Sequence, residues 1–279
     1  MEVDRMVRSL WSAATGMNAQ QTNVDTIANN LANVNTSGFK AQGAQFKSLL
    51  YQTIQSNTTT ANGDPKPTTS QVGLGVRTAS INQYFTQGSL LDNQSSNAFA
   101  ISGDGFFAYN NADGNPVYTR NGDFTWALGN TSGSQLVLTT SDGNPVLNTS
   151  GAEIKLDGSY IASRITVGSD GTIYYPDTNG TPQEVGQKIG LWQFNNPGGL
   201  ERVGNTSFSA TAASGEAINE STSTTVKKSE IQQGYLEGSN VNVATEMVNL
   251  IVAQRAYEMN STAITTTDEM MQTANSLKR

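Results

Sequence analysis

The stretch TIANNLANVNTSGFKAQ, residues 26–42, joins a helical pattern to a turn. Ile27, Leu31 and Val34 recur at helical spacing, whereas the positions between them are mostly Asn. The turn sequence NTSG follows, and its glycine suits the left-handed conformation that often lies just past a helix. We therefore predict that an N-terminal helix ends near Asn35.

Two apolar rows with a spacing of seven residues continue this helix back to the N-terminus, and only Gln20 interrupts them. Such rows are typical of the narrow seam of a coiled coil rather than of a helix that lies on a globular core. A similar seam runs through the C-terminal residues. Because neither helix can bury its seam alone, we predict that the two helices pair as a coiled coil. The predicted assembly residues are Leu10, Met17, Val24, Ile27, Leu31, Val34, Val243, Met247, Leu250, Tyr257, Ile264 and Met271.

Between the helices, short β-like runs such as AFAI, FFAY and IGLWQF alternate with turn dipeptides. These dipeptides are Asp113-Gly114, Asn121-Gly122, Asp142-Gly143, Asp170-Gly171 and Asn179-Gly180. The polar segment QSNTTTANGDPKPTTSQ is typical of a linker. The predicted fold class is therefore α+β with a central all-β domain.

The predicted organisation has five parts. They are an N-terminal helix at 1–35, a linker and extended segment at 36–71, a central β domain at 72–208, a return linker at 209–240 and a C-terminal helix at 241–279. Predicted hinge and linker residues are Gly38, Phe39, Pro65 and Pro67.

The composition argues against several classes of function. A net charge of -7 over 279 residues disfavours a nucleic-acid partner, which requires Lys and Arg to replace the counterions of the phosphates. The absence of Cys and His removes disulfides, thiol catalysis and the commonest general base and metal ligand. No apolar run approaches the ~20 residues of a membrane span, and the first residues lack the apolar centre of a signal peptide.

Two acidic motifs could carry chemistry. Asp104 and Asp123 could in principle serve as the paired carboxylates of a glycoside hydrolase. The GDG motif at 103–105 could be read as a phosphate or calcium loop, but it lacks the P-loop lysine and the EF-hand spacing. Asp-Gly pairs are what tight hairpins require, so we interpret both motifs as turns. We predict no catalytic, cofactor or metal site.

The flanks of the N-terminal helix are poor in charge. Between Val7 and Asn35 the charged residues are Arg8 and Asp25, and amides occupy most other polar positions. In a homopolymer every charge recurs in each subunit and is costly to bury unless it finds a partner. An amide both donates and accepts, so it can pair with an identical neighbour. This pattern predicts a helix that is surrounded by copies of itself.

These motifs resemble a known family. LWSAATGMNAQQTNVDTIANNLANVNTSGFK and QGYLEGSNVNVATEMVNLIVAQRAYEMNSTAITTTDEMMQ resemble the terminal signatures of flagellar rod and hook axial proteins. The shorter stretches LLYQTI, QVGLGVR, FTQGSL, ISGDGFF and YTRNGDF are similar to subunits of the distal part of the rod. The resemblance spans nearly the whole chain and weakens between about residues 125 and 225.

The resemblance implies a structural subunit, not an enzyme, that leaves the cell unfolded through the flagellar type III export apparatus. It implies a helical homopolymer in the basal body that spans the periplasm and transmits motor torque. The other implied partners are proximal rod proteins, the hook protein and the peptidoglycan- and outer-membrane-associated rings. A proximal rod or hook protein is the near alternative. A secreted carbohydrate-binding β protein is the distant one, and it leaves the terminal heptads without a purpose.

Overall fold

The computed structural model describes residues 2–55, 70–129, 135–177, 180–204, 206–224 and 226–276, without the side chains of residues 2–7, 54, 55 and 70. Residues 56–69 of the predicted linker, including Pro65 and Pro67, lie outside the described residues. The chain divides into two compact units. Unit one comprises Met1–Ala32, Gln42–Gln83 and Asn242–Arg279, and unit two comprises Asn33–Ala41 and Tyr84–Val241. Among the described residues, no helix is long and apolar enough to span a membrane.

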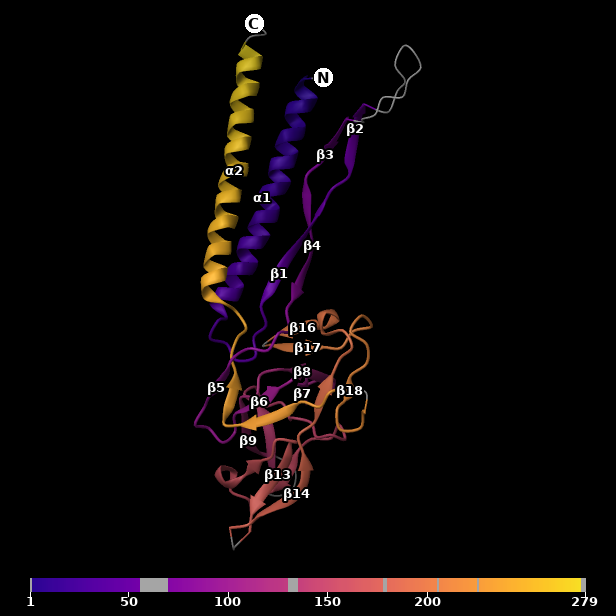
Figure 1. Cartoon of the computed structure of the whole chain (residues 1–279), viewed down its shortest axis with the longest axis vertical. Coiled ribbons are helices and arrows are strands. Elements are labelled where there is room, and N and C mark those ends of the chain that lie inside the picture. Colours follow the sequence, from indigo (N-terminus) through magenta and orange to yellow (C-terminus); the bar gives the residue numbers. More distant parts are fainter. Residues whose placement is uncertain are drawn as a thin grey trace. The chain divides into compact units, whose positions relative to one another are not determined.

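Unit one is a helix pair with a β ribbon beside it (Figure 1). Its elements are α1 (Glu2–Ala32), β1 (Gln42–Ser48), β2 (Tyr51–Gln55), β3 (Ser70–Gly73), β4 (Val76–Gln83) and α2 (Val243–Ser276). Strand β1 pairs antiparallel with β4, and β2 pairs antiparallel with β3. Helix α1 packs against α2 and also against β1 and β4. The predicted helices at both ends of the chain, with β structure between them, are therefore confirmed.

Unit two is all β apart from two short 3-10 helices at Ala162–Arg164 and Pro197–Gly199. Its strands are β5 (Leu90–Asp92), β6 (Phe99–Ser102), β7 (Phe106–Asn110), β8 (Pro116–Thr119), β9 (Phe124–Gly129), β10 (Gln135–Thr140), β11 (Lys155–Asp157), β12 (Thr166–Val167), β13 (Thr172–Pro176), β14 (Pro182–Lys188), β15 (Leu191–Gln193), β16 (Glu201–Gly204), β17 (Ser207–Ser209), β18 (Ile218–Asn219), β19 (Glu230–Gln233) and β20 (Tyr235–Glu237). The largest sheet has the strand order β16-β17-β8-β7-β15-β18. Smaller sheets have the orders β11-β10-β9, β12-β13-β14, β19-β6 and β20-β5.

Strand β7 lies at the centre of the core of unit two. Successive side chains of a strand point to opposite faces, so Phe106 and Phe107 enter two different apolar clusters. Phe107 packs edge-on against Phe124 with 5.1 Å between ring centroids, and Phe106 packs edge-on against Phe194 at 5.7 Å. The aromatic run of this strand is therefore core.

The boundaries of the units differ from the pattern-based division. Residues 72–83 lie in unit one because β3 and β4 pair with β2 and β1. The predicted return linker at 209–240 contains β18, β19 and β20. These strands have two to four residues each, too few to show an alternating pattern.

Glycines mark the predicted turns in two different ways. Gly114, Gly143, Gly171 and Gly180 have φ between +78° and +84°, as tight turns require. Gly122 has no positive φ; a Cβ there would collide with the carbonyl oxygen of Phe99. Its glycine is needed for close approach of two backbones.

Helix α1 ends at Ala32, and the chain turns through residues 33–38 into unit two. Gly38 has a φ of +71°, the left-handed conformation expected just past a helix. Its N–H donates to the carbonyl oxygen of Glu237 at 2.8 Å. Within unit two, the segment that follows α1 in the chain is therefore hydrogen-bonded to β20, the strand that precedes α2 in the chain.

Gly38→Ala is expected to destabilise unit two more than Gly114→Ala does. Both positions have a positive φ, which costs an alanine about 1–2 kcal/mol. At Gly38 the added Cβ would also lie 2.5 Å from the backbone nitrogen of Asn121, whereas at Gly114 it meets open space. Urea unfolding followed by fluorescence of the buried Trp192 measures both losses. Equal losses would contradict the packing argument.

Candidate assembly surface

The two helices of unit one meet in an antiparallel contact with a constant register. A Cβ placed on Gly16 would lie 2.9 Å from the Nδ2 of Asn260. Asn30 Nδ2 donates to Glu246 Oε2 at 3.3 Å. These two contacts are two heptads apart on each helix, so the same register holds over fourteen residues.

The row of α2 that faces α1 is small and polar. Ala253 and Thr267 are the buried residues of α2 in its described part. Together with Glu246 and Asn260 they form a row with a spacing of seven residues. Small side chains let two helix backbones approach closely. This row is absent from the apolar heptad pattern because only one of its four members, Ala253, is apolar.

The predicted assembly residues fall into three groups in the structure. Ile27 is buried on α1. Partly covered residues are Leu10, Met17, Val24, Leu31, Leu250, Ile264, Met271 and, in the turn that follows α1, Val34. Exposed residues are Val243, Met247 and Tyr257. Their part in assembly stays a prediction.

Asn30 makes contacts within its own chain, whereas the sequence pattern grouped it with the other amides of α1 that we predicted to face copies of the chain. Its side chain is 1% exposed. The Oδ1 accepts from the N–H of Gln42 at 2.9 Å, and the Nδ2 donates to the carbonyl oxygen of Gln42 at 2.8 Å. Because its Nδ2 also reaches Glu246, this one amide joins α1 to both β1 and α2. Nothing in its sequence context separates it from the neighbouring asparagines.

Helix α2 exposes an apolar face that no described part of the chain covers. We call this surface the outer face of α2; its members are Val248, Ile251, Val252, Met259 and Met270, each between 54% and 66% exposed. The charged side chains Arg255 and Glu258 lie within the same span and pair at 2.9 Å. A monomer rarely exposes a contiguous apolar patch of this kind unless it binds another molecule. The outer face of α2 is therefore the candidate assembly surface.

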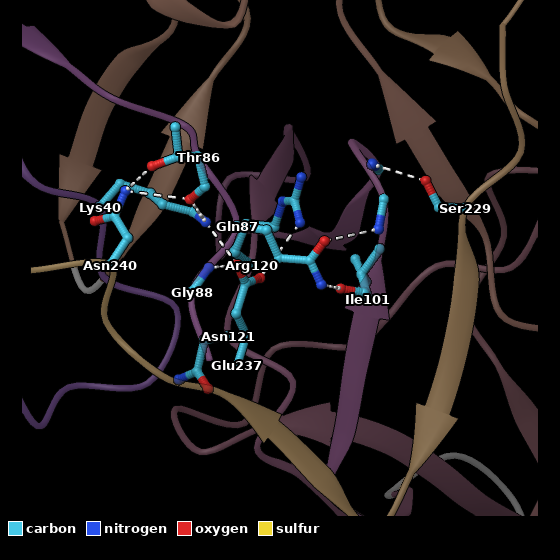
Figure 2. Close-up of polar contacts among 12 residues, drawn as sticks. Lys40, Thr86, Gln87, Gly88, Ile101, Arg120, Asn121, Ser229, Glu237 and Asn240 are labelled. Atoms are coloured by element: carbon cyan, nitrogen blue, oxygen red, sulfur yellow. Dashed lines mark hydrogen bonds and ion pairs between the residues drawn. The ribbon is translucent and has the colours of Figure 1, made fainter. Parts of the chain in front are cut away.

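A buried charge cluster in unit two holds the segments that flank the helices in sequence (Figure 2). Lys40 Nζ lies 2.6 Å from Glu237 Oε1, and Arg120 Nη1 lies 3.3 Å from Glu237 Oε2. Lys40 also donates to the carbonyl oxygen of Thr86 at 2.8 Å, and the N–H of Gly88 donates to Glu237 at 3.0 Å. One carboxylate thus joins three separate parts of the chain.

The cluster contains two cations for one carboxylate. Burial lowers the pKa of Lys40, and the charge of Glu237 opposes this shift. Burial also lowers the pKa of Arg120, again opposed by Glu237. The guanidinium of Arg120 lies 4.9 Å from the centroid of the Phe106 ring, and its Nε has no hydrogen-bond partner among the described residues. The negative charge of Glu237 therefore supplies most of the favourable interaction that offsets the burial of both cations.

Hydrogen bonds of the Asn240 side chain strengthen the same junction. The N–H of Ala41 donates to Asn240 Oδ1 at 2.7 Å, and Asn240 Nδ2 donates to Thr86 Oγ1 at 2.8 Å. Phe39, a predicted hinge residue, is buried at 2% exposure beside the cluster residue Lys40. The hinge function of Gly38 and Phe39 stays a prediction. The sequence held no signal that would have joined Lys40, Arg120 and Glu237, because 80 and 117 positions separate them.

The two aspartates considered for hydrolysis have different surroundings. Asp104 lies in the exposed turn between β6 and β7; burial lowers the pKa of Lys40 and of Arg120, and the charge of Asp104, after that of Glu237, opposes both shifts. Asp123 precedes β9 and lines a hollow of about 420 Å³ together with Tyr109, Arg202 and other side chains.

Comparison with known proteins gives matches at both ends and in the middle of the chain. Residues 10–40 match the family described as flagella basal body rod protein. Residues 100–175 match the flagellar hook protein FlgE/F/G D1 domain, and residues 232–277 match the flagellar basal body rod FlgEFG protein C-terminal family. These segments include most of α1, the whole of α2, the segment that follows α1 and the segment that precedes α2.

Relatives match over nearly the full length. A Borreliella burgdorferi protein named flagellar basal-body rod protein FlgG is 43% identical over 280 residues, which cover 98% of this chain and 100% of the relative. The protein of the same name from Bacillus subtilis is 36% identical, with the same coverage. A second Bacillus subtilis protein, named flagellar hook-basal body complex protein FlhP, is 33% identical, again with that coverage.

Glu237→Ala is expected to destabilise unit two by about 3–5 kcal/mol, because it leaves two buried cations without their carboxylate. The matched control is Glu153→Ala, which removes an exposed partner of Lys155 and should cost less than about 1 kcal/mol. Chemical denaturation followed by Trp192 fluorescence measures both. A loss at Glu237 no larger than at Glu153 would show that the cluster contributes little.

Proposed function

The chain belongs to the flagellar basal-body rod protein family and is a structural subunit of the flagellar rod, and we propose that it builds this rod by polymerising with copies of itself. In this proposal the outer face of α2 is covered by a neighbouring copy. The helix pair forms a coiled-coil layer within the polymer, and unit two forms a separate β layer.

The observation that supports this proposal is the exposure of Val248, Val252 and Met259 on a long helix. Burial of such side chains is favourable at roughly 25 cal/mol per Å² of apolar surface removed from water. Among the described residues, α1, β1 and β4 lie against one another and leave these side chains of α2 exposed, which favours cover by another molecule. A second copy is always present in a homopolymer.

The proposed polymer has further partners. Proximal rod proteins and the hook protein would contact its two ends, and the peptidoglycan- and outer-membrane-associated rings would surround it. The type III export apparatus would deliver the chain. Its task in the proposal is mechanical, the transmission of motor torque to the hook, and it involves no catalysis.

Val252→Asp is expected to abolish polymerisation while the monomer keeps its helix content and the stability of unit two. The substitution places a carboxylate on a face that becomes dry in the polymer, at a cost of several kcal/mol per subunit. Sedimentation and negative-stain electron microscopy measure polymer formation, and circular dichroism checks the monomer.

Leu128→Asp is the matched control, because Leu128 is a 72% exposed leucine on β9 of unit two. It should leave polymerisation intact. Normal polymers from Val252→Asp would rule out the outer face of α2 as the assembly surface.

A further inference from the structure

We propose that the outer face of α2 packs against the exposed row of α1 in the next copy, and that Asp25 and Arg255 form an ion pair across this contact. This inference rests on the homopolymer proposed above. The exposed row of α1 consists of Trp11, Asn18, Asp25 and Ala32, with Gln21 and Ala28 beside it. Charge and size complementarity select this partner surface.

Asp25 is the only acidic residue in the part of α1 whose side chains are described. It is exposed, and no described cation lies within ion-pair distance of it. When the charge-poor α1 is surrounded by copies, this carboxylate loses water and requires a cation from a neighbour. Among the described residues of its own chain, Asp25 is therefore a carboxylate without a cationic partner.

Arg255 is the only cation in the described part of α2. Its pair with Glu258 is solvent-exposed, with 74% and 63% of the two side chains accessible, and such pairs contribute little. A guanidinium carries five N–H donors, so Arg255 can hold Glu258 and a second carboxylate together. Because apolar residues of the outer face surround it, Arg255 is desolvated when this face is covered.

The pair defines a register that the other side chains satisfy. Copies in a polymer share one orientation, so α1 of one copy runs antiparallel to α2 of the next, as it does within the chain. With Asp25 opposite Arg255, Ala28 lies opposite Val252, and Ala32 lies opposite Val248. In this register Val252 and Val248 of α2 thus meet two alanines of α1, which is the size match that close helix packing requires.

This register is shifted by four residues from the contact within the chain, where Asn30 meets Glu246. At 1.5 Å per residue the shift corresponds to an axial offset of about 6 Å between neighbouring copies. The contact joins two different surfaces, so each copy can bind one neighbour through α1 and another through α2. Such a contact propagates into a polymer.

Charge reversal tests the ion pair. Asp25→Arg and Arg255→Asp alone should each raise the critical concentration for polymerisation about tenfold, and the double variant should restore it to within about threefold of wild type. Arg77→Asp is the control on the same unit, since Arg77 is an exposed cation on β4. Rescue of Asp25→Arg by Arg77→Asp, or no rescue by Arg255→Asp, would overturn the pairing.

Disulfide trapping tests the register, because the chain has no cysteine of its own. A chain with Ala32→Cys and Val248→Cys should form a ladder of cross-linked oligomers when its polymers are oxidised and run on a non-reducing denaturing gel. A chain with Ala32→Cys and Met259→Cys places the thiols about 16 Å apart along the helices and should give no ladder. The opposite outcome would overturn the register. A cross-linked dimer from a chain that carries Val248→Cys alone would also overturn it.

The outcomes separate this inference from the proposed function. Wild-type protein that stays monomeric at all concentrations would refute the homopolymer and the inference with it. Normal polymers in which the charge-reversed variants behave as wild type would refute only the Asp25–Arg255 contact.

Discussion

The carboxylate of Glu237 is the point on which the organisation of unit two depends. It accepts from Lys40, Arg120 and the backbone of Gly88, and its residue's carbonyl oxygen accepts from Gly38. Two of these residues come directly after the α1 segment, and Glu237 itself comes shortly before α2. The segment that follows α1 and the segment that precedes α2 therefore meet in one buried cluster of unit two. Removing one partner of such a junction costs much more than the net contribution of the pair, because the remaining charges stay buried.

The side chains of helices α1 and α2 are covered to different extents and by different neighbours. α1 is covered on two sides, by α2 and by the β1–β4 ribbon, so most of its side chains are partly or fully buried. α2 contacts α1 through small residues such as Ala253 and leaves larger apolar side chains such as Val252 in solvent. A monomer gains nothing from this arrangement, whereas a polymer subunit gains a surface whose cover is supplied by its neighbours. The scarcity of charge on α1 fits the same requirement, since each charge must be neutralised in every copy.

Parts of the structure that depend on local patterns were predictable. The heptad rows gave both helices, and the membership in the flagellar rod family follows from the same terminal motifs. The turn glycines Gly38, Gly114 and Gly143 adopt the positive φ that their sequence context indicated. The aromatic run around Phe106 is core. Short strands such as β18 were missed because two residues cannot display an alternation.

The sequence by itself determined where the helices lie, where turns must occur and which class of protein the chain belongs to, because periodicity and glycine conformation act over a few neighbouring residues. Only the tertiary structure decided which face of each helix is used. Asn30 and Ala253 became contact residues because Gln42, Glu246 and α1 come within reach of them. Likewise Lys40, Arg120 and Glu237 form a cluster because distant segments fold onto one another. The spacing of these residues along the chain does not predict that contact.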